Sequence, residues 1–130
     1  MFKLKKYMKK EYLYWMKKAD SDLRKAKILR ENNEFDGVTF YAQQTAEKAL
    51  KSISIYKNLG IIKTHDLLLL GKKVKLPENI LEKAVVLNSF YTSSRYPILI
   101  EEQDISEQSA DKSLSYAGEV LKWCKQQITT

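Results

Sequence analysis

Apolar residues recur along most of this chain at alternating three- and four-residue steps. The pattern is most regular over residues 36–56, DGVTFYAQQTAEKALKSISIY. Its apolar positions, with the preceding Phe35, are Val38, Ala42, Ala46, Ala49, Ile53 and Tyr56. This spacing lines up one face of an α-helix, and alanines in its middle leave room for a neighbouring helix to come close. We therefore expect a long helix here, with a core seam on one side and a polar surface for a partner on its flanks.

Two further stretches with helical periodicity lie towards the two ends of the chain, over residues 9–30 and from near Ser106 to Ile128. Their apolar positions are Tyr12, Trp15, Ala19, Leu23, Ala26 and Leu29 in the first, and Ala110, Leu114, Ala117, Leu121, Cys124 and Ile128 in the second. Residues 32–33, both Asn, end the first helix, because Asn tolerates the left-handed conformation of helix C-termini. Residues 1–10, which are basic, are expected to begin loose and then to become the first turns of a helix.

The region between these stretches predicts one short and one long helix. Thr64 is expected to be the N-cap of the short helix, with Asp66 in its first turn and the leucines of residues 67–70 in its body. Pro77 suits the first turn of the next helix, which continues to about Thr92. Only 4 Gly and 2 Pro are present, too few for the many turns of an all-β protein. The expected fold is an all-α, up-and-down antiparallel four-helix bundle plus one short helix, as one domain over residues 1–130.

Positive charge is concentrated at the N-terminus. The whole chain carries a formal net charge of +7. Residues 1–30 hold eleven Lys or Arg against three Asp or Glu, which gives +8, and the remaining residues hold twelve against thirteen, which gives −1. Such a field favours nucleic acid or an acidic protein partner. A solvated Lys-rich face that only aids solubility is the alternative interpretation.

The cellular compartment and the possible chemistry of the protein are inferred mainly from motifs that the sequence lacks. No apolar run approaches the roughly 18 residues that span a bilayer, and no secretory leader is recognisable. The single cysteine, Cys124, cannot form an internal disulfide and falls on an apolar stripe, where we expect a buried small hydrophobe. These observations predict a cytoplasmic protein without a membrane association. With one His and one Cys, no usual catalytic or metal-ligand set can be assembled, so we assign no catalytic residue, metal or cofactor and favour a non-enzymatic protein.

Polar residues on and after the central helix are the candidates for ligand binding. They are Gln44, Glu47, Lys48, Lys51, His65, Asp66, Arg95 and Tyr96. The lysines and the arginine would pair with charge, and Arg suits bidentate phosphate contacts. His65 and Asp66 would be polar contacts, and Tyr96 a stacking residue. A plainer alternative treats Glu47 and Lys51 as an exposed i,i+4 pair and His65 as a structural hydrogen-bonding residue.

Three segments together resemble the HEPN domain family. These are YAQQTAEKALKS at residues 41–52, KTHDLLLL at residues 63–70 and FYTSSRYP at residues 90–97, and the similarity covers roughly residues 14–123. The resemblance implies an up-and-down helical bundle, commonly a homodimer, encoded beside a minimal nucleotidyltransferase in two-component systems of the toxin–antitoxin kind. It also implies nucleotide or nucleic-acid binding.

One branch of that family consists of metal-independent ribonucleases, with an Arg followed by a His after four to six intervening residues. Here no histidine follows Arg95, and His65 precedes it. The match is closer to the non-nucleolytic, single-domain archaeal and bacterial members. We therefore expect a binding module that partners a nucleotidyltransferase, and keep a ribonuclease that uses His65 with Arg95 across a dimer cleft as the disfavoured alternative.

Overall fold

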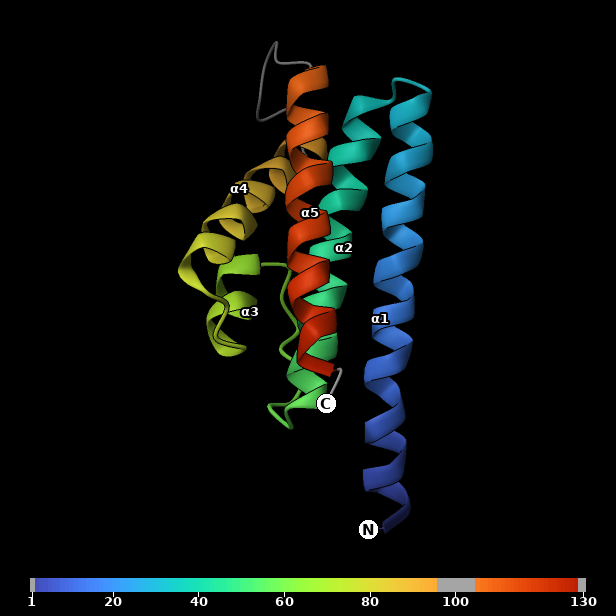
Figure 1. Ribbon diagram of the computed structural model, residues 1–130, viewed down its shortest axis with the longest axis vertical. Coiled ribbons are helices and arrows are strands. Elements are labelled where there is room, and N and C mark those ends of the chain that lie inside the picture. Colours follow the sequence, from blue (N-terminus) through green and yellow to red (C-terminus); the bar gives the residue numbers. More distant parts are fainter. Residues whose placement is uncertain (1, 96–104, 129–130) are drawn as a thin grey trace.

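The chain folds into a bundle of helices. The computed structural model describes residues 2–95 and 105–128, with the side chains of residues 2–9 and 91–95 left undescribed. The helices are α1 (Phe2–Glu31), α2 (Phe35–Tyr56), α3 (Leu67–Lys73), α4 (Glu78–Arg95) and α5 (Glu107–Ile128), and the described ranges contain no strand. The four long helices alternate in direction along the chain (Figure 1). The predicted all-α bundle with one short helix is therefore confirmed.

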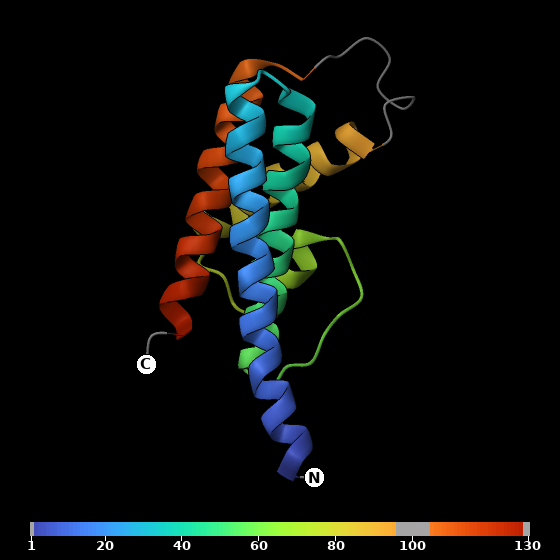
Figure 2. The ribbon, with the colours of Figure 1, turned by 90° about the vertical axis from the view of Figure 1, so that its right-hand side faces the viewer.

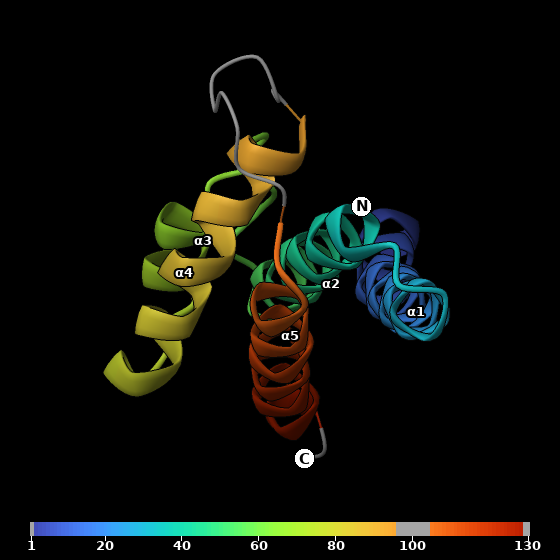
Figure 3. The same ribbon diagram turned by 90° about the horizontal axis from the view of Figure 1, so that it is seen from above.

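Helix α2 is the centre of the bundle. It contacts α1, α3, α4 and α5, whereas α1 and α4 lie on opposite sides of it and do not meet in the described ranges (Figure 3). Helices α2 and α5 run in the same direction side by side, and α4 is inclined to the others (Figure 2). The fully buried Ala42, Ala46 and Ala117 belong to the core that these helices share, and small side chains let helix backbones approach closely.

The apolar face predicted for α2 forms the core seam. Val38, Ala42, Ala46, Ala49 and Ile53 have no solvent-exposed surface, and Phe35 and Tyr56 at the two ends are half-buried. Around this seam pack the largest fully buried apolar side chains of the other helices, among them Leu67 and Leu70 of α3, Leu87 of α4 and Val120 of α5. Burial of this apolar surface is the main contribution to stability.

Helix boundaries differ from the expected ones at three places. Helix α1 begins at Phe2, before the start expected near Lys9. The N-cap of α3 is Asp66 and not Thr64, because the Asp66 carboxylate accepts a hydrogen bond from the Leu68 amide at 2.9 Å. Helix α4 continues past Thr92 to Arg95. A proline disfavours helix only at the residue before it, so Pro97 allows helix up to this point.

Ion pairs on the surface tie α1 to α5. Arg30 Nε lies 2.6 Å from Asp111 Oδ1, and Arg30 Nη2 lies 2.5 Å from Glu107 Oε1. The hydrogen bond from Arg30 lowers the pKa of the Asp111 carboxyl below its ordinary value.

On the same helix α5, Cys124 is fully buried, as predicted, and burial raises the pKa of its thiol. A buried thiol that keeps its proton is a packing residue and not a nucleophile.

No helix in the described part of the chain combines the length and the apolar composition that a bilayer span requires.

Candidate functional site

The polar flank of α2 is buried instead of exposed. Gln43, Glu47 and Lys51 retain 0%, 3% and 7% of their accessible surface, while Gln44 and Lys48 are half-buried. The expected open polar surface is therefore absent at Glu47 and Lys51, which are buried. The reason is tertiary: α2 is surrounded by the other helices, and they cover its polar flanks as well as its apolar seam.

Glu47 and Lys51 form a buried ion pair one helical turn apart. Lys51 Nζ lies 2.9 Å from Glu47 Oε2, and the side chains are only 9% and 4% exposed for Lys51 and Glu47. The ammonium also lies 5.6 Å from the centre of the Trp15 ring on α1, a cation–π distance. An exposed pair of this kind contributes a few tenths of a kcal/mol, but a buried pair whose partner is removed costs several. The plainer interpretation of an exposed pair does not hold.

The second oxygen of Glu47 holds the histidine. His65 Nδ1 lies 2.8 Å from Glu47 Oε1, and the His65 side chain is 60% exposed although the carboxylate is buried. Because a carboxylate only accepts hydrogen bonds, Nδ1 carries the proton in this contact. A charged acceptor on Nδ1 fixes both the orientation of the ring and the tautomer of the neutral imidazole.

Two glutamines hold the backbone at His65. Gln43 Nε2 donates to the carbonyl oxygen of His65 at 3.1 Å and lies 3.5 Å from Glu47 Oε1. Gln44 Nε2 in turn donates to Gln43 Oε1 at 2.8 Å. This contact occupies the side-chain oxygen of Gln43, so that its side-chain nitrogen is the group that faces the α2–α3 connection. The connection between α2 and α3 is thus fixed to α2 at the point where the imidazole emerges, so Gln44 acts through Gln43 and not as a direct contact to the ring.

Asp66 faces α4 and caps the N-terminus of α3. Its Oδ1 accepts from the Leu68 amide and, at 2.7 Å, from Nδ2 of Asn88 on α4. Asn88 Oδ1 accepts from the Leu67 amide at 2.9 Å, so the pair closes a reciprocal clamp between α3 and α4. Asp66 is consequently a positioning residue for the neighbouring His65. Asn88 was not among the predicted site residues, and its one signal was a polar residue on the apolar stripe of its helix.

Lys48 belongs to a different cluster, on the α1 side of α2. Its ammonium hydrogen-bonds to Oδ2 of Asp22, a residue of α1 whose side chain is 3% exposed, and Lys25 Nζ lies 3.6 Å from the other oxygen. This arrangement links α1 to α2 and directs Lys48 away from His65. Asp22 was also missed, because its position in the sequence suggests an ordinary exposed acid.

The eight predicted residues are therefore divided by the structure. Glu47, Lys51 and His65 meet in one network, with Gln44 and Asp66 supporting it from either side and Lys48 apart. The Arg95 side chain and all of Tyr96 lie outside the described residues. We name the network of Gln43, Glu47, Lys51 and His65 the His65 site. Among the described side chains, no group of three or more His, Cys, Asp or Glu is placed to hold a metal ion.

Comparison with known proteins agrees with the fold. The family model of the HEPN domain matches residues 12–127. The crystal structure of TT1696 from Thermus thermophilus is similar with a TM-score of 0.82 and 26% sequence identity, over 88% of this chain and 96% of that one. The crystal structure of ST0689, described as an archaeal HEPN homologue, has a TM-score of 0.79 and 30% identity, over 91% and 98%. No curated protein matches the sequence. The chain belongs to the HEPN domain family.

Proposed function

We propose that this HEPN chain is a binding module for a nucleotide or another phosphate-bearing ligand, with His65 as the contact residue. The observation that carries the proposal is an exposed imidazole fixed by a buried carboxylate whose own charge is balanced by Lys51. Histidines that serve only packing do not need an ion pair beneath them. Buried charges are costly to maintain, and they are found where they position a functional group.

Charge balance explains why the ligand would be an anion. A lone carboxylate beneath the ring would repel a phosphate, but Lys51 neutralises Glu47 at 2.9 Å. The imidazole then adds positive charge whenever it is protonated, within a protein of net charge +7. The protonated ring and the long-range field both favour a phosphate at the exposed side of His65.

Arg95 at the end of α4 and the following Tyr96 are proposed to complete the contact. Arg95 stands seven residues after Asn88, which is two helical turns or about 10 Å along the axis, and Asn88 itself touches Asp66. We propose Arg95 as a second charge partner for the phosphate and Tyr96 as the residue that stacks on a base. Glu47 and Lys51 act through His65 as positioning residues, because their burial removes them from direct ligand contact.

The replacement His65→Gln tests the site. We expect binding of ATP, measured by isothermal titration calorimetry, to weaken at least tenfold, because a hydrogen bond to a charged group contributes about 1.5–3 kcal/mol. Tripolyphosphate should show the same loss, since the contact is to phosphate and not to the base. Arg95→Ala should weaken both probes similarly. Lys112→Gln, at an exposed position on α5, is the matched control and should leave both affinities unchanged.

If the wild type and both site variants bind ATP and tripolyphosphate with equal affinity, the proposal is wrong.

The pairing of Glu47 with His65 also has the geometry of an oriented acid or base, which keeps a ribonuclease as the second candidate. Labelled RNA incubated with the wild type and with His65→Gln separates the two. His65-dependent cleavage would establish an enzyme, whereas cleavage that persists in the variant would indicate a contaminant.

We further propose that the chain associates as a homodimer and with a minimal nucleotidyltransferase. Support comes from exposed large apolar side chains of the α2–α3 connection, of α3 and of α4, namely Leu59, Ile61, Leu69 and Val85. Exposed apolar groups on adjoining elements are typical of protein contact surfaces.

Light scattering coupled to size-exclusion chromatography tests this association. The wild type alone should elute as a dimer, and Leu69→Glu should shift it to monomer because it places a charge on the apolar side. Ile28→Glu, on the far side of the bundle, is the control and should stay dimeric. Co-expression with a nucleotidyltransferase encoded next to the gene should give one co-eluting complex. A wild-type monomer that ignores that protein would contradict both associations.

A further inference from the structure

Helix α1 carries a basic face that the other described elements leave uncovered. We define the outer face of α1 by Lys10, Leu13, Tyr14, Lys17, Arg24 and Ile28, all of which are exposed. These positions fall within about 100° of one another around the helix at 100° per residue. Lys10, Lys17 and Arg24 follow at seven-residue steps, so they form a row of cations spaced about 10 Å apart.

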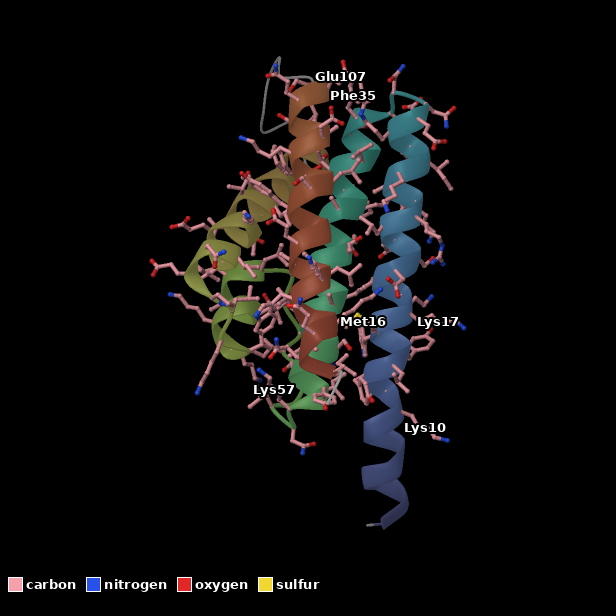
Figure 4. All side chains as sticks on the ribbon, in the orientation of Figure 1. Lys10, Met16, Lys17, Phe35, Lys57 and Glu107 are labelled. Carbon is pink, nitrogen blue, oxygen red and sulfur yellow. The ribbon has the colours of Figure 1, made fainter. Side chains whose placement is uncertain are left out.

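The opposite face of α1 makes all of its packing contacts. Met16, Ala19 and Ala26 are buried, and among the described helices α1 meets only α2 and α5. Figure 4 shows Lys10 and Lys17 projecting away from the bundle, whereas Met16 points inward between α1 and α2. The N-terminal turns of α1 also extend beyond the ends of the other helices (Figures 1 and 2). No described helix therefore covers the outer face of α1 between Lys10 and Ile28.

The charge of this face is not cancelled by its neighbours. Within the described side chains, Lys10, Lys17 and Arg24 make no ion pair. Two carboxylates of α1 are engaged elsewhere: Asp22 is buried against Lys48, and Asp20 Oδ1 accepts from Lys125 Nζ at 2.6 Å. Glu11 and Glu31 stand near the two ends of the face.

From this arrangement we infer that the outer face of α1 binds the phosphodiester backbone of nucleic acid. A row of cations along a straight helix matches a linear polyanion, which gains affinity by releasing condensed counterions at each contact. Tyr14, 59% exposed and with Lys18 Nζ 5.5 Å from its ring centre, supplies an aromatic surface on which an unpaired base stacks. This inference is independent of the His65 site.

Two other occupants fit the face less well. A second copy of this chain in a two-fold dimer would place the same cations against each other, and like charges destabilise such a contact. A lipid bilayer needs a continuous apolar stripe, but Leu13 and Ile28 are separated by fifteen residues, roughly 22 Å along the helix. Charge complementarity therefore favours the polyanion.

The test compares two charge reversals of equal size. Lys17→Glu/Arg24→Glu alters the outer face of α1, and Lys112→Glu/Lys122→Glu makes the same net change at exposed positions of α5. Fluorescence anisotropy with a labelled single-stranded 20-nucleotide RNA should show at least tenfold weaker binding for the α1 variant. Its salt dependence should also flatten, because each lost phosphate contact lowers the slope of log K against log salt by about 0.7. The α5 variant should change affinity less than threefold.

Two further arms identify the ligand and the site. Tyr14→Ala should weaken the single-stranded RNA about fivefold or more and leave a duplex of the same length unaffected, because only an unpaired base can stack. Lys112→Gln, at an exposed position on α5, should bind both as the wild type does. Equal losses from the two charge reversals, no RNA binding at low salt, or binding to phosphatidylserine vesicles without RNA binding would each overturn the inference. Circular dichroism of each variant should show that its helical content is unchanged.

Discussion

Replacing Glu47 by alanine should lower the free energy of unfolding by about 3 kcal/mol, because it leaves the buried Lys51 ammonium without its carboxylate. The Glu47 side chain is 4% exposed and the Lys51 side chain 9%, so water replaces the lost partner poorly. The same change removes the acceptor of His65 Nδ1 and of Gln43. Urea denaturation followed by circular dichroism measures the loss.

A double variant separates the unpaired charge from lost packing. Glu47→Leu/Lys51→Met replaces both charges by apolar groups of similar size, and such replacements of buried pairs are often neutral. We expect the double variant to recover most of the stability that Glu47→Ala loses, while ATP binding through His65 stays weakened. A stability loss below about 0.5 kcal/mol for Glu47→Ala would show that the pair is solvated and does not organise the site.

Truncating Leu50 to alanine should cost about 3 kcal/mol, because Leu50 is fully buried on the central helix and its removal leaves a cavity between packed helices. The measurement is again urea denaturation, with an unchanged m-value as the sign that only stability has altered.

Leu69→Ala is the matched control for that truncation. Leu69 of α3 is 52% exposed, so the same chemical change should cost less than about 0.5 kcal/mol in the monomer. If the two truncations cost the same, Leu50 does not occupy the core of the folded chain. If Leu69→Ala instead lowers stability only at high protein concentration, its role lies in association.

The sequence predicted the helices well because helix signals are local. The alternating apolar steps of residues 35–56 and 110–128 mark one face of each helix, and Asn33 does adopt the left-handed conformation expected at the end of α1, with φ of 59°. The errors fell at helix ends. Thr64 and Asp66 are both good capping residues two positions apart, and in the fold Asp66 caps α3 and also accepts from Asn88 of α4.

The residues of the candidate site could be named from the sequence, but the role of each residue could not. Glu47, Lys51 and His65 could be named as polar residues with chemistry, yet nothing local shows that two of them are buried and one is exposed. Lys48 is adjacent to Glu47 in the sequence but points to Asp22 on α1. A rotation of 100° per residue around a helix surrounded by neighbours sends successive side chains to different partners.

What the sequence by itself determined is the all-α class, the order of the helices and the seam on α2, because each follows from a period of 3.6 residues and from the chemistry of turns. What only the tertiary structure decided is the depth of each polar residue. Burial depends on which helices surround a residue, and the packing of α1, α3, α4 and α5 around α2 turned an expected surface into the ion pair beneath His65.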